Sequence, residues 1–277
     1  MNLADERLRE LDNPALTADE RAVIRAQVAA DLIHKGQYED AREALGELWR
    51  GVGERPNLEG FDERTAAEVL LQAGVLSGWL GKVKGAQDAA KDLISESAAL
   101  FEKLGEPKRA ADARADLSVC YWREGAYQEA RAVLESTAAL VEENAPLKAK
   151  TILCFAMVAS SAGRYSDAFC LLMESAPLFG EHISHRLRGI FHNELAISLS
   201  FLGRAERRAD YTDRAIRFDR AGRDLGASVG LRRFYQRPAP GGGSGRSGRG
   251  AGERRAGNAD SYRGTRGDKT TAPGRSL

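Results

Sequence analysis

Apolar residues recur three and four positions apart through about residue 226, which is the spacing of one face of an α-helix. The segment 111–140 shows this pattern clearly, because it reads as two helices that meet at a tight turn formed by Gly125, Ala126 and Tyr127. Similar units recur before and after this segment. The hydrophobic pattern therefore predicts an all-α fold built from helix pairs.

A short motif marks the turn inside each pair: a glycine, an aromatic or small residue two positions later, and an alanine five positions after the glycine. The glycines of successive copies lie 45, 44, 38 and 40 residues apart, at Gly36, Gly81, Gly125, Gly163 and Gly203, and the motif decays in the last copy. A steady period of this size in a helical sequence is typical of stacked helix pairs. We therefore predict an α-solenoid of about five stacked antiparallel pairs.

The recurring Gly, aromatic and Ala positions resemble the tetratricopeptide repeat (TPR) in its long-period form, over about residues 20–205. The usual tryptophan near the start of each first helix is missing. The runs at 78–81, 120–131 and 205–216 are similar to a group of bacterial TPR proteins. In that group more repeats generally follow, and some members end in a helix-turn-helix DNA-binding segment. The resemblance implies that this chain is the front part of a longer regulatory or adaptor protein.

The resemblance also implies a right-handed superhelix whose first helices line a concave face. By likeness to the family, the second, fifth and ninth positions of four first helices point into that face: Glu68, Leu71, Val75, Asp112, Ala115, Val119, Lys150, Leu153, Met157, Ile190, Asn193 and Ile197. This largely apolar set with a few charges suits an amphipathic helix or an extended peptide. The alternative is that a tight superhelix buries part of this face as core.

The sequence contains no recognisable catalytic constellation, so we expect no enzymatic activity and no cofactor. His182, His185 and His192 lack a cysteine or paired carboxylate at a matching offset. We interpret them as surface or interface histidines, with a metal site as the alternative. The function predicted is a protein–protein interaction scaffold that binds a peptide or helix of a protein partner in the concave groove. The alternative is the effector-sensing region of a bacterial transcriptional regulator whose DNA-binding part is absent here.

Composition changes abruptly near the C-terminus, since residues 232–277 hold eleven glycines and ten arginines. We predict a short N-terminal helix and lead-in over 1–17, the repeat array over 18–226, and a disordered tail over 227–277. From Arg232 onward there is a surplus of eight positive charges, which leaves about −7 for residues 1–231. An acidic body makes nucleic acid an unlikely ligand for it. The tail itself reads as a frameshift product, a solvated linker or a nucleic-acid-binding segment.

The three cysteines, Cys120, Cys154 and Cys170, lie in apolar helical patterns without a CxxC motif, and we expect all of them to be buried. The N-terminus is charged and lacks an apolar signal region, and no apolar run approaches the length of a membrane span. These features predict a soluble protein of the reducing cytoplasm, with no membrane partner.

The C-terminal end of the array is predicted to be poorly capped. Terminal repeats need a polar outer face, whereas the fifth first helix is rich in apolar residues and its partner helix is charged and poorly patterned. We expect residual apolar surface around Phe201, Ile216 and Phe218, and possible self-association through it. The alternative is that Tyr211, Ala215 and Phe218 cover this surface and the protein is monomeric.

Overall fold

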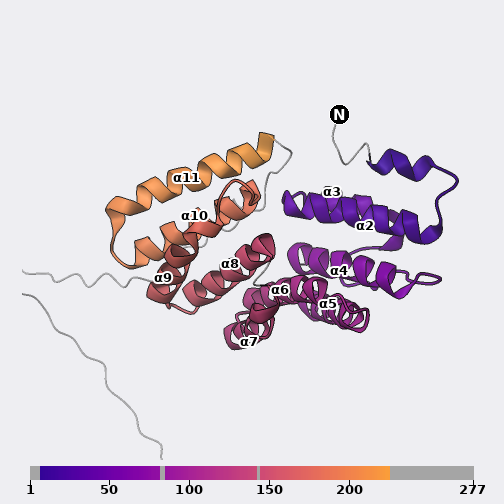
Figure 1. The fold of residues 1–277 in the computed structure, drawn as a ribbon, viewed down its shortest axis with the longest axis horizontal. Coiled ribbons are helices and arrows are strands. Elements are labelled where there is room, and N and C mark those ends of the chain that lie inside the picture. The colour runs from indigo at the N-terminus through magenta and orange to yellow at the C-terminus, as the bar shows by residue number, and fades with distance from the viewer. Residues whose placement is uncertain (1–6, 82–84, 142–143, 225–277) are drawn as a thin grey trace, which may run out of the picture. The chain divides into compact units, whose positions relative to one another are not determined.

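The computed structural model describes residues 7–81, 85–141 and 144–224, and the predicted tail at 227–277 lies outside them (Figure 1). Across these ranges the chain forms helices and no strand. The helices make five antiparallel pairs: α2 (Ala18–His34) with α3 (Tyr38–Leu45), α4 (Glu63–Leu80) with α5 (Ala86–Lys103), α6 (Pro107–Glu124) with α7 (Tyr127–Thr137), α8 (Ala145–Ser161) with α9 (Tyr165–Ser175), and α10 (His185–Phe201) with α11 (Ala205–Asp224). Short 3-10 helices lie at η1 (Glu10–Asp12), η2 (Gly46–Leu48), η3 (Ala138–Leu140) and η4 (Ala176–Leu178).

The pairs stack one on the next along the chain (Figure 1). Each first helix packs against the first helix of the following pair, so α2, α4, α6, α8 and α10 form one continuous row. The second helices α3, α5, α7 and α9 each contact their own first helix and the next one. This arrangement confirms the all-α, TPR-like fold of stacked pairs that the sequence predicted.

Local sequence signals set the helix starts. At α2 the Thr17 hydroxyl accepts a hydrogen bond from the Glu20 amide at 3.2 Å, and the Glu20 carboxylate accepts one from the Thr17 amide at 2.7 Å. This reciprocal capping satisfies two amides that have no partner inside the helix. Asp62 caps α4 in a similar way, with its carboxylate 2.7 Å from the Thr65 amide. Pro107 begins α6, where its missing N–H costs nothing.

One turn glycine acts differently from the expected pattern. Gly81 has a φ of −62°, so it does not end α4 through the left-handed conformation, and Gly85 takes a φ of 90° instead. A Cβ at Gly81 would lie 2.5 Å from the Cβ of Ala86 and 2.5 Å from the Ser77 carbonyl oxygen. Glycine is needed at position 81 for close approach and not for a positive φ.

Gly74 is the position where α4 and α5 approach most closely, and it yields a first prediction. A Cβ there would lie 2.6 Å from Cγ1 of the fully buried Ile94 and 3.2 Å from the Ala90 carbonyl oxygen. We expect Gly74→Ala to lower the free energy of unfolding by about 1–2 kcal/mol, because overpacking outweighs the better helix propensity of alanine. Urea denaturation followed by circular dichroism measures this change.

Gly78, one turn later on α4, is the matched control. A Cβ there would lie 3.1 Å from the Cys120 sulfur, which is the end of a side chain and can shift. We expect Gly78→Ala to change the free energy of unfolding by less than about 0.5 kcal/mol, since the propensity gain offsets the crowding. Equal destabilisation by the two substitutions would contradict this account of the helix crossing.

The C-terminal end of the array differs in part from expectation. Phe201 and Ile216 are 46% and 39% exposed, as the sequence analysis expected. Phe218, by contrast, is half-buried: its ring stacks on His192 with centroids 5.2 Å apart, and the Arg188 guanidinium lies 4.2 Å from its centroid. Ala215 is buried as well, so α11 covers more of α10 than predicted. Self-association through the remaining exposed surface stays a prediction.

Candidate functional site

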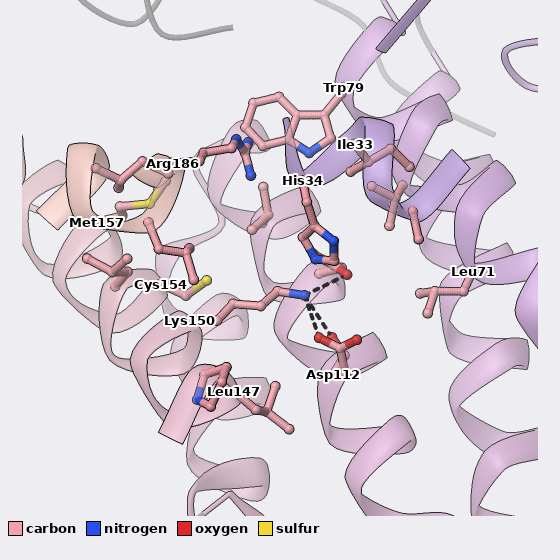
Figure 2. A pocket seen from close by; sticks show the side chains of 18 of the residues that line it. Ile33, His34, Leu71, Trp79, Asp112, Leu147, Lys150, Cys154, Met157 and Arg186 are labelled. Atoms are coloured by element: carbon pink, nitrogen blue, oxygen red, sulfur yellow. Dashed lines mark hydrogen bonds and ion pairs between the residues drawn. The ribbon is translucent and has the colours of Figure 1, made fainter. Parts of the chain in front are cut away.

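The first helices of all five pairs enclose a cavity of about 370 Å³ (Figure 2). Helix α3 contributes Tyr38, and the other lining side chains come from the row of first helices or the segments just before them. Most of the wall is apolar, and its larger aliphatic members are Ile33, Leu71, Val75, Val119, Leu147, Leu153, Met157, Leu187 and Ile190. A volume and lining of this kind are typical of a ligand site.

Nine of the twelve predicted concave-face residues line this cavity: Leu71, Val75, Asp112, Val119, Lys150, Leu153, Met157, Ile190 and Asn193. The other three do not. Ala115 is completely buried, the Glu68 carboxylate pairs with the Arg109 guanidinium, and Ile197 is half-buried outside the cavity. Leu71 and Leu153 are also almost entirely buried, so part of the face is packed as core.

A charged cluster crosses one side of the cavity between α6 and α8. The Lys150 ammonium lies 2.7 Å from the Asp112 carboxylate and 2.8 Å from the Asp116 carboxylate, which sits one helical turn further along α6 (Figure 2). The Arg109 guanidinium lies 3.2 Å from Asp112 and also contacts Glu68. Two cations are thus matched by three carboxylates, and the pairs tie α4, α6 and α8 together.

Burial and mutual attraction set the ionisation of this cluster. Burial alone would lower the pKa of Lys150, but Asp112 and Asp116 outweigh it and raise that pKa. Burial raises the pKa of Asp116, and repulsion from Asp112 adds to the effect. The pKa of Asp112 is lowered, because Lys150 and Arg109 outweigh its desolvation. Lys150 is therefore held as an ammonium ion and is not available as a base or nucleophile.

His34 faces the same cluster from the end of α2, and Figure 2 shows its ring lying near the Lys150 ammonium. Burial lowers the pKa of His34, and the positive charge of Lys150 lowers it further. The imidazole is therefore neutral at pH 7 and adds a polar, uncharged surface to the cavity.

An aromatic and cationic group joins the first and fifth pairs beside the cavity. The Arg186 guanidinium, at the start of α10, donates a hydrogen bond of 2.7 Å to the Tyr38 hydroxyl. It also lies 5.8 Å from the centroid of the Trp79 ring, which stacks on Tyr38 with centroids 5.3 Å apart (Figure 2). Because the two pairs are separated by the whole array, this contact depends on how the stack curves.

Several cavity residues were missed by the sequence analysis: His34, Tyr38, Trp79, Asp116, Arg186 and Glu194. Asp116 had a usable signal, since it follows the predicted Asp112 by four residues and therefore shares its helical face. Glu194 directly follows the predicted Asn193. Tyr38 and Arg186 lie at helix starts, outside the family positions that were used.

The histidine and cysteine candidates carry no visible chemistry of their own. His182 is exposed, and His192 packs between aromatic rings where burial lowers its pKa to about 4. Burial raises the pKa of Cys120 to about 12 and that of Cys154 to about 11, so both thiols stay protonated. Within the described part of the chain, no group of His, Cys, Asp or Glu side chains could hold a metal ion.

The expectation that all three cysteines are buried was wrong for Cys170, which is exposed. Cys170 lies two residues from both Ala168 and Leu172, which are buried. Two residues turn an α-helix by about 200°, so Cys170 points away from the face that packs.

Fold and cavity together define an all-α repeat protein with an internal ligand-sized site. No protein-family model matches the chain, and no curated protein matches it. Similar solved structures include a putative kinesin light chain from Podosopora anserina with nearly identical TPR-like repeats, at 16% identity over 76% of this chain and 99% of that one, with a TM-score of 0.49. A structure of MamA is 19% identical over 73% of this chain and 98% of its own, with a TM-score of 0.41. In the ranges that the structure describes, no helix has the length and apolar character needed to cross a membrane.

Proposed function

We propose that this chain is a non-enzymatic interaction scaffold that holds a segment of a protein partner in the cavity along its first helices. The observation that carries the proposal is the cavity wall, which is mostly apolar and is built jointly by all five pairs. Burying one aliphatic side chain of a partner there contributes roughly 1.5–3 kcal/mol. Two or three such side chains would give a useful affinity before the costs of association are subtracted.

The dimensions favour an extended peptide over a helix as the bound segment. An α-helix with its side chains is about 10–12 Å in diameter. Two turns of such a helix would occupy roughly twice the 370 Å³ of the cavity. A few consecutive side chains of an extended segment fit it better, with polar groups meeting Asn193 and the charged cluster.

A second candidate function is supported by the contact between Arg186 and Tyr38. A cavity of 370 Å³ lies in the range of small-molecule sites, and this hydrogen bond links the first pair to the fifth beside it. A small ligand that changed this contact would alter the relation between the two ends of the array. That behaviour would suit the effector-sensing region of a regulator.

Capture experiments on the full chain test the scaffold proposal. Ile190→Lys places a charge in the cavity wall, whereas Ile216→Lys makes the same change on α11, where Ile216 is 39% exposed. We expect a specific partner to be retained by the unsubstituted chain and by Ile216→Lys, and to be lost at least tenfold by Ile190→Lys. Thermal melting followed by circular dichroism controls for folding of each variant.

Equal retention by the two variants would place the binding surface elsewhere and contradict the proposal. Release of a small molecule from the purified chain, with no protein partner sensitive to Ile190→Lys, would instead favour the effector-sensing alternative. Mass spectrometry of the eluted fractions distinguishes these outcomes.

A further inference from the structure

Glu194 is a buried acid in the wall of the cavity. Its residue is only 7% exposed, it lies on α10, and it lines the cavity together with Asn193. Its one protein partner is the Ser160 hydroxyl on α8. Among the described residues, no lysine, arginine or histidine forms an ion pair with it. Glutamate is seldom buried to this extent without such a partner.

The other charges of the cavity do not supply the missing cation. Lys150 is bound between Asp112 and Asp116, and Arg109 is bound to Glu68 and Asp112. Arg186 lies eight residues before Glu194 on the same face of α10, which is about 12 Å along the helix. Its guanidinium is directed to Tyr38. Glu194 is therefore left as the one carboxyl in this wall that a bound ligand could neutralise.

We propose that Glu194 recognises a cationic group, a primary ammonium or a guanidinium, carried at the end of an apolar chain that lies against Met157, Leu153 and Ile190. These three side chains line the same cavity and offer no competing charge. The inference rests on the proposed function, in which the cation would belong to a lysine or arginine side chain of the partner segment. A free alkylamine offers the same chemistry.

Such binding should depend on pH. Burial raises the pKa of Glu194 to about 7, and the hydrogen bond with Ser160 opposes the shift only partly. The charged or titratable groups that share the cavity wall are His34 on α2, Lys108, Arg109, Asp112 and Asp116 on α6, Lys150 on α8 and Arg186 on α10; no described side chain of α9 or α11 lines it. An alkylammonium keeps its proton throughout this range. Its affinity should therefore rise as the pH increases through 7 and Glu194 becomes ionised.

Calorimetric titration of the full chain with three probes of equal chain length tests the proposal. The probes are n-octylamine, octan-1-ol and octanoate, which are cationic, neutral and anionic. We expect octylamine to bind at least tenfold more tightly than octanol at pH 8, and octanoate to bind most weakly. The preference for octylamine over octanol should fall several-fold at pH 6.

Glu194→Gln keeps the shape and removes the charge, so it should weaken octylamine binding at least tenfold, abolish its pH dependence and leave octanol binding unchanged. Glu174→Gln, at an exposed position on α9, is the matched control and should change nothing. A capped peptide, acetyl-Leu-Lys-Leu-amide, tests whether a lysine side chain in a peptide is accepted in the same way.

The order of the three probes on the unsubstituted chain does not depend on any variant folding. Octanoate binding as tightly as octylamine, no binding of octylamine, or a full effect retained in Glu194→Gln would each overturn the proposal. If octylamine binds through Glu194 but no protein partner is sensitive to Ile190→Lys, the cation site stands and the scaffold function fails. If a partner is captured and octylamine ignores Glu194, the reverse holds.

Discussion

Replacing Phe101 with alanine should lower the free energy of unfolding by about 4 kcal/mol, which is the usual cost of deleting a buried aromatic side chain. Phe101 lies on α5, is 0% exposed and belongs to the core shared by the first three pairs. The Arg109 guanidinium lies 5.0 Å from the centroid of its ring. The substitution therefore removes core packing and also loosens the arginine that holds Glu68 and Asp112 beside the cavity.

Phe201→Ala is the matched control, because Phe201 is 46% exposed at the end of α10. Its ring stacks on Tyr165 with centroids 4.0 Å apart, so we expect a loss of about 1 kcal/mol or less. Urea denaturation followed by circular dichroism measures the two changes under the same conditions. Similar losses for the two variants would mean that Phe101 does not occupy a close-packed core.

The repeat architecture was predictable because each helix pair mainly contacts its neighbours. In such an array, a local motif recurring with a steady period is enough to define both the pair and its stacking. The turn at Gly125, the capping residues Thr17 and Glu20, and the small residue Gly74 at a crossing all follow this rule, and the structure places them as expected.

The cavity was only partly predictable, because it depends on contacts between pairs that are not neighbours. The family positions located Leu71, Asp112 and Lys150, which point toward the centre of the row of first helices. The hydrogen bond between Arg186 and Tyr38 spans 148 residues and joins the first and fifth pairs. No periodic pattern indicates such a contact, because it depends on the accumulated curvature of the stack.

Glu194 illustrates a second reason for the gap between sequence and site. A glutamate between Asn193 and Leu195 reads as an ordinary helix residue, and nothing in its spacing shows that burial will shift its pKa. The shift is created by the low polarity of its surroundings on α8 and α10, which only the packed structure defines. Residue types were thus readable from the sequence, while their electrostatic states were not.

The second large effect is expected at Lys150. Lys150→Met removes the one cation that lies between Asp112 and Asp116, whose side chains are 25% and 20% exposed. Breaking a buried ion pair from one side costs about 3–5 kcal/mol, because the remaining charge is left uncompensated. Partial exposure of these carboxylates places our expectation near the lower end, at about 3 kcal/mol of lost unfolding free energy at pH 7.

The loss should depend on pH in a defined direction. Without Lys150, repulsion and burial raise the pKa values of Asp112 and Asp116 above their unfolded values, so the penalty is present at pH 7 and shrinks as the pH falls and they take up protons. In the unsubstituted chain the pKa of Asp112 is lowered, so the stability it contributes is present above its ordinary pKa and is lost below it. The difference between variant and unsubstituted chain should therefore narrow from pH 7 to pH 4.

Lys103→Met is the matched control, because Lys103 is 65% exposed and pairs with Glu63 at the surface. An exposed pair contributes about 0–1 kcal/mol, so this variant should unfold at nearly the same urea concentration as the unsubstituted chain. The triple variant Lys150→Met, Asp112→Asn, Asp116→Asn should recover much of the lost stability, since it removes the unpaired charges together with their partner. A stability loss in Lys150→Met that is independent of pH and is not recovered in the triple variant would show that Lys150 acts through packing and not through its charge.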